Sequence, residues 1–129
     1  MTNEEIKQLI KTTVAETVQQ LKDAGLLLDN TVSAYKKTEA LLWRYTELKK
    51  SQEPYARRVV AEIDKLLAEA ENEPYADVIR LYYFAGNKNA ACAAIMCCDE
   101  RTCRRYRKKL VQQFAVRLAS DEFIRELLT

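Results

Sequence analysis

The sequence predicts an all-α fold, and three observations lead to this prediction. Only two Gly and two Pro occur in 129 residues, which leaves little turn chemistry for a sheet of many strands. Apolar residues recur at the three- and four-residue spacing of amphipathic helices along most of the chain. Hydrophobic residues make up 48% and charged residues 31%, the proportions of a folded domain. We therefore expect amino-terminal amphipathic helices followed by a helical bundle at the carboxyl end.

The first predicted helix begins at Thr2, because Thr2 and Glu5 have the spacing of a capping box, and it ends at Gly25. Its apolar stripe consists of Ile6, Leu9, Ile10, Val14, Val18 and Leu21. Such a helix either packs on its own domain or pairs with the same helix of a second subunit. Both interpretations stay open.

Six further helices follow from apolar spacing and from the positions of Pro and Gly. Pro suits the first turn of a helix and Gly suits its end. The predicted ranges are Thr31 to Lys50, Pro54 to about Ala70, Pro74 to Gly86, Asn89 to Met96, Glu100 to Leu118, and a short helix after Ser120. We divide the chain into a helical oligomerisation or interaction segment, residues 1–72, and a second unit, residues 73–129.

The composition argues against several classes of function. Histidine is absent, which removes the commonest general base and every zinc site that contains histidine. We therefore expect no enzyme, no catalytic residue and no cofactor. The chain has no apolar run long enough to span a bilayer and does not open with a secretion signal, so we expect a cytoplasmic protein without a membrane partner.

Four cysteines lie within twelve positions, at Cys92, Cys97, Cys98 and Cys103. In a reducing compartment they are most simply free thiols, and buried ones behave as small hydrophobes. A four-thiolate zinc site is the alternative. Structural zinc sites favour cysteine pairs separated by two to four residues. Here Cys97 and Cys98 are adjacent, and the outer two cysteines are each separated from them by four residues. We expect no metal site.

The informative constellation lies between residues 89 and 110, where a short helix, a very short turn and a basic helix follow each other. This is the arrangement of a helix-turn-helix DNA reader. Ala93 supplies a small side chain where the helices approach, and Asp99 can accept from the first amides of the second helix. Cys97 occupies the turn position where many such motifs have glycine.

The long helix predicted from Glu100 to Leu118 has an apolar face and a cationic face. Its inward stripe is Cys103, Tyr106, Leu110, Phe114 and Leu118. Residues 86–119 contain eight basic and two acidic residues, a net charge of +6 in a chain whose total is +2. A polyanion is attracted by the local electrostatic field of such a segment more than by the total charge of the protein. Arginine is also well suited to contacts with phosphate and guanine. The alternative is that these charges form a solvated face.

Residues 76–118 resemble the fourth region of bacterial sigma factors. The matching residues occur in the same order and at the same spacing: Leu81, Tyr83, Phe84, Gly86, Ala93, Asp99, Thr102 and Cys103. Within that superfamily the chain is most similar to small phage and prophage transcriptional regulators of the ArpU and RinA type, whose upstream helices residues 31–50 also resemble. The departures are Cys97, Cys98, Cys103 and the helix after Ser120.

The resemblance implies a double-stranded DNA partner, with the long helix in the major groove. The residues expected to read base edges are Glu100, Arg101, Arg104, Arg105 and Lys108, and those expected to hold phosphates are Lys88, Arg107 and Lys109. The chain is too short for the other sigma regions, so we expect a phage or prophage regulator, most simply an activator, at the bacterial nucleoid.

A single helix-turn-helix unit makes few contacts to bases, so we expect the protein to need a second macromolecular contact for its specificity. RNA polymerase or a second copy, paired through the amino-terminal helices or the surface of Trp43 and Tyr45, would supply it. Two other functions remain open. A small-terminase-like packaging protein would form a large ring, and a protein-interaction module would bind an acidic partner without binding duplex DNA.

Overall fold

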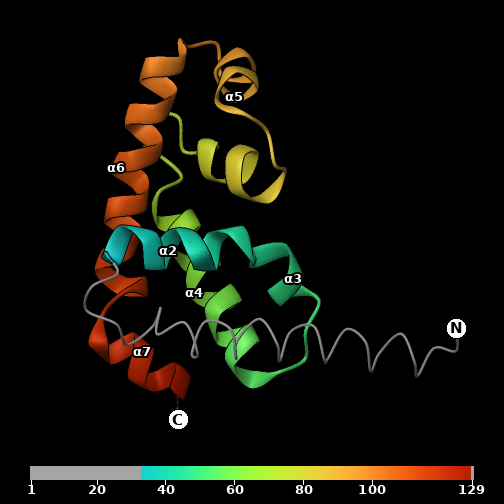
Figure 1. Ribbon diagram of the computed structural model, residues 1–129, viewed down its shortest axis with the longest axis vertical. Helices are drawn as coiled ribbons and strands as arrows, with labels where there is room; N and C mark the ends of the chain where they lie inside the picture. Colours follow the sequence, from blue (N-terminus) through green and yellow to red (C-terminus); the bar gives the residue numbers. More distant parts are fainter. Residues whose placement is uncertain (1–32, 129) are drawn as a thin grey trace, which may run out of the picture.

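The computed structural model describes residues 33–128, and all regular structure in this range is helical (Figure 1). The elements are α2 (Ala34–Trp43), α3 (Tyr45–Lys49), α4 (Pro54–Glu69), the π-helical turn η1 (Arg80–Phe84), α5 (Asn89–Ile95), α6 (Glu100–Leu118) and α7 (Asp121–Leu128). The all-α prediction is confirmed. The helix predicted from Thr2 to Gly25 lies outside the described residues. None of the described helices has the length and apolar character needed to cross a bilayer.

The helices that begin at strong sequence signals have the predicted bounds. Pro54 stands in the first turn of α4, where its missing amide hydrogen is not needed. The side chain of Asp99 caps α6, which spans the predicted Glu100 to Leu118. Ser33, two residues after the predicted start, caps α2 by accepting from the amide of Lys36 at 3.2 Å.

The predicted helix from Thr31 to Lys50 is divided in two at Arg44. There the backbone leaves helical geometry, with φ of −100° and ψ of 2°. The guanidinium of Arg44 donates to the carbonyl of Ala40 at 3.2 Å, which satisfies an acceptor near the end of α2. As a result α3 leads toward α4, with which it is in contact.

The prediction of a helix from Pro74 to Gly86 is wrong over its first four residues. Tyr75 has a φ of 57°, in the left-handed region, so no helix can begin at Pro74. Helical geometry starts at Val78 and passes into η1, where the amide of Ala85 donates to the carbonyl of Arg80 at 2.9 Å. Gly86, with a φ of 75°, ends this segment as predicted.

The central element is α6, which runs along the long axis of the molecule and is in contact with α2, α4, α5 and α7 (Figure 1). One hydrophobic core joins both predicted segments, because Leu42 and Ile63 belong to the same buried cluster as Leu110 and Phe114. The boundary predicted after residue 72 therefore does not separate two cores.

An aromatic layer connects α2 to η1. The Trp43 ring lies 4.8 Å from that of Tyr83 and 5.2 Å from that of Tyr82, centroid to centroid. The hydroxyl of Tyr83 donates to Glu39 at 2.5 Å, and burial together with this bond raises the pKa of Tyr83. Trp43 is 45% exposed, but Tyr45 is only 8% exposed. The predicted Trp43 and Tyr45 surface is thus wrong for Tyr45, which stacks on Phe84 at 4.0 Å.

Candidate nucleic-acid interface

The unit predicted to read DNA consists of α5, a four-residue connection and α6. The two helices are in contact, and Cys92 and Ala93 of α5 are buried. The small side chain of Ala93 thus lies at a buried position, as the prediction required. The connection, residues 96–99, is closed by the amide of Cys98, which donates to the carbonyl of Ala93 at 3.0 Å.

Cys97 has a φ of 56°, so the connection adopts the left-handed conformation at the position where many helix-turn-helix motifs have glycine. The position was predicted from the motif, whereas the left-handed conformation of a cysteine there was not. Its side chain is exposed, and its amide donates to the carbonyl of Ala94 at 3.3 Å.

We expect Cys97→Gly to stabilise the protein by about 1 kcal/mol, because glycine adopts positive φ without the clash of a Cβ atom. Urea denaturation would measure this gain. Cys97→Ala is the control, since it removes the thiol and keeps the Cβ; its stability should match that of the wild type. Equal gains in both variants would show that the thiol, and not the backbone, is responsible.

The start of α6 is fixed by Asp99. Its Oδ1 atom accepts from the amide of Thr102 at 2.6 Å, and this bond holds the pKa of the Asp99 carboxyl below its usual value. A charged cap also suits the positive end of the helix dipole. Asp99 therefore anchors the end of α6 that carries the predicted base-reading residues.

The inward face of α6 is broader than the predicted stripe. Cys103, Leu110, Phe114 and Leu118 are buried as expected, whereas Tyr106 is only half-buried at the edge of this face. The buried set continues with Arg107, Val111 and Ala115. The face therefore packs against several helices at once, which fixes the orientation of α6.

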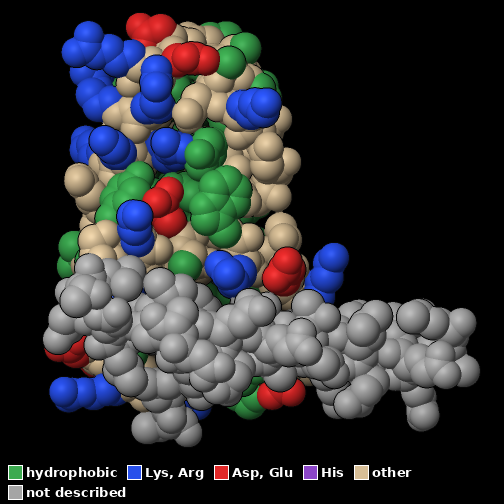
Figure 2. Space-filling view, in the orientation of Figure 1, with side chains coloured by type: hydrophobic (Ala, Val, Ile, Leu, Met, Phe, Trp, Pro, Cys, Tyr) green, Lys and Arg blue, Asp and Glu red, His purple; other side chains and the backbone are tan. Residues whose placement is uncertain are grey.

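The predicted cations point outward with one exception. Those that are exposed are Lys88, Arg101, Arg104, Arg105, Lys108 and Lys109. Figure 2 shows Lys and Arg side chains gathered over the upper part of the molecule, along α6. Glu100 is also exposed and lies 3.7 Å from Arg104; both side chains are about half exposed, so this pair holds Arg104 only weakly.

Arg107 is the exception, because its side chain is buried and does not face solvent as the predicted phosphate contact requires. It is 9% exposed, and its Cζ atom lies 3.8 Å from the centroid of the Tyr82 ring. Its Nε and Nη1 atoms are buried without a hydrogen-bond partner among the described residues. A signal was present, because position 107 follows Cys103 by four residues and precedes Leu110 by three, which places it on the inward face.

Arg117 also leaves the cationic face. Its Nε atom lies 2.8 Å from Glu62 of α4, and its Nη2 atom lies 3.1 Å from Glu126 of α7. Arg117 thus joins α6 to its neighbours, and the net charge of +6 counted along the sequence overstates what a polyanion would meet.

The cysteines divide into two pairs by exposure. Cys92 and Cys103 are buried, and burial raises the pKa of both thiols, that of Cys103 to about 11. Both are therefore protonated at neutral pH and pack as small hydrophobes. Cys97 is exposed and Cys98 half-buried. Within residues 33–128, no group of three or more Cys, Asp or Glu side chains is placed to hold a metal ion.

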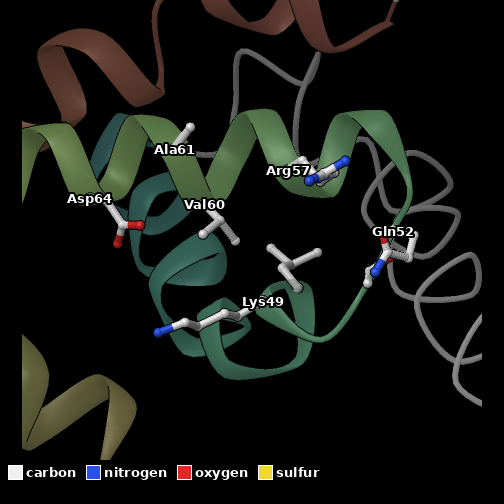
Figure 3. Close-up of a pocket in the computed structure, with 8 residues that line it drawn as sticks. Lys49, Gln52, Arg57, Val60, Ala61 and Asp64 are labelled. Carbon is white, nitrogen blue, oxygen red and sulfur yellow. The ribbon is translucent and has the colours of Figure 1, made fainter.

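A pocket of about 260 Å³ lies between α3 and α4, away from the cationic face of α6 (Figure 3). Lys49, Arg57 and Asp64 contribute charges of both signs to its lining, and no residue of α5 or α6 takes part. Asp64 is already engaged, since it accepts from the hydroxyl of Tyr45 at 2.6 Å. The pocket therefore adds nothing to the cationic face.

Comparisons of the chain with protein-family models, with curated proteins and with solved structures find no match.

Proposed function

We propose that this protein is a sequence-specific double-stranded DNA-binding regulator of phage or prophage transcription, most simply an activator, which inserts α6 into the major groove. One observation carries the proposal. The face of α6 opposite the core exposes Arg101, Arg104, Arg105 and Lys108 together, on a helix that packs against α2, α4, α5 and α7. A major groove about 12 Å wide admits one α-helix, and arginine makes bidentate contacts to guanine.

Each exposed side chain has a role in this proposal. Arg101, Arg104, Arg105 and Lys108 read base edges, and Glu100 accepts from a cytosine amino group. Lys88, at the start of α5, and Lys109 hold phosphates of the DNA backbone. Arg107 takes no part, because its guanidinium is stacked on Tyr82.

A second contact supplies the remaining specificity, since one such unit offers few base contacts. We propose RNA polymerase or a second copy of the chain as the partner, at the nucleoid of a bacterial host. The half-exposed Trp43 is the described residue best suited to this contact, because large aromatic side chains dominate the energetics of protein interfaces.

Substitutions of Arg104 and Lys109 should have different effects on DNA binding. A duplex selected from a random pool serves as the specific site, and a scrambled duplex as the non-specific one. We expect Arg104→Ala to weaken binding to the selected duplex by about 1 to 3 kcal/mol and to loosen sequence preference. Lys109→Ala should weaken both duplexes alike. Equal losses on the two duplexes for both variants would reject these separate roles.

A further inference from the structure

Tyr106 lies between two of the outward cations of α6 and belongs to neither the core nor the predicted contacts. The Arg105 Cζ atom is 5.3 Å from the centroid of its ring, and the Lys109 Nζ atom is 5.8 Å from it. Both distances are within the range of cation–π attraction. Arg105 and Lys109 are four residues apart on the helix, where like charges repel each other, so the ring offers both a favourable position.

A second tyrosine holds this ring from outside α6. Tyr75, in the connection between α4 and η1, packs on Tyr106 edge to face, with ring centroids 4.9 Å apart and an angle of 60° between the planes. Tyr75 adopts a φ of 57°, which is costly for a residue with a large side chain. Such conformations persist where the surroundings hold them, and they cluster at functional sites.

We propose that Tyr106, held by Tyr75, is a positioning residue for DNA binding. Its ring fixes the long side chains of Arg105 and Lys109 before DNA arrives, so that less side-chain entropy is lost when they contact base edges and phosphates. This inference rests on the proposed DNA-binding function and adds a role for two residues that do not themselves carry the charge.

The test compares Tyr106→Leu with Tyr106→Phe in the full chain, by measuring the Kd for a duplex selected from a random pool. Leucine keeps apolar packing against Tyr75 but has no π system, so we expect binding about fivefold weaker. Phenylalanine keeps the ring and should bind within about twofold of the wild type. The same pair is then measured in an Arg105→Ala/Lys109→Ala background, where Tyr106→Leu should have no further effect.

The outcomes separate the two proposals. A wild-type chain that binds no duplex at low salt overturns the function and this inference together. If the wild type binds, two results overturn the inference alone. Either Tyr106→Leu leaves the Kd of the otherwise wild-type chain unchanged, or it weakens binding by the same factor in the Arg105→Ala/Lys109→Ala background. If thermal unfolding shows that Tyr106→Leu does not fold, Tyr75→Asn takes its place, because asparagine tolerates positive φ and removes the supporting ring. We then expect Tyr75→Asn to weaken binding to the selected duplex about fivefold, and to have no further effect on the Kd in the Arg105→Ala/Lys109→Ala background.

Discussion

Phe114→Ala should lower the free energy of unfolding by about 3 to 5 kcal/mol, a large part of the roughly 5 to 15 kcal/mol typical of a domain. Phe114 is 2% exposed on α6 and belongs to the core that joins both halves of the described chain. Removing its ring leaves a cavity in the element that contacts α2, α4, α5 and α7. The packing that fixes the orientation of the cationic face would weaken with it.

Urea denaturation measures this loss, and two signals follow it. Trp43 is the only tryptophan of the chain and packs on Tyr82 and Tyr83, so its fluorescence reports the layer between α2 and η1. Circular dichroism reports the helices as a whole. Val116→Ala is the matched control, because Val116 lies two positions away on α6 and is 80% exposed; we expect a change within about 0.5 kcal/mol. A loss below about 1 kcal/mol for Phe114→Ala would contradict the described packing of α6.

The elements that the sequence predicts correctly are those with local signals at their ends. Pro54 and Asp99 act within one turn of the helix that they begin, so their effect can be read without knowledge of the rest of the fold. The rule that proline suits the first turn of a helix fails at Pro74, because Tyr75 adopts a left-handed φ that depends on the surrounding structure. The break at Arg44 and the π-helical bonds of η1 likewise have no counterpart in apolar spacing.

The candidate interface could be predicted to the extent that it depends on the faces of one helix. Spacing alone placed Arg101, Arg104, Arg105 and Lys108 outward, and all four are exposed. The same spacing puts Arg107 on the inward face, but it could not show what covers the guanidinium, because the ring of Tyr82 comes from another element. The pairing of Arg117 with Glu62 depends in the same way on how α4 packs against α6.

Replacing Arg101, Arg104 and Arg105 together with alanine should have the largest effect on DNA binding. Each side chain is exposed, so the substitutions remove contacts to DNA without opening a cavity in the core. At about 1 kcal/mol or more for each arginine, the combined loss on the selected duplex is at least about a hundredfold. The free energy of unfolding should change little, because surface substitutions usually shift it by less than about 0.5 kcal/mol each.

A matched variant removes the same charge elsewhere. Lys50, Arg57 and Lys65 are exposed residues outside α5 and α6, and their joint replacement with alanine also lowers the net charge by three. Since non-specific attraction depends on charge near the bound DNA, this control should lose much less affinity than the α6 variant. The comparison separates the cationic face of α6 from the total charge of the protein.

The most direct test of the account is the Kd of these three proteins for the selected duplex, measured across a series of salt concentrations. We predict that wild type and control bind with similar affinity and a similar steep dependence on salt, whereas the triple arginine variant binds at least about a hundredfold more weakly and with a shallower dependence. Equal binding by all three proteins, or no binding by the wild type at low salt, would contradict the assignment of α6 as the DNA-reading helix.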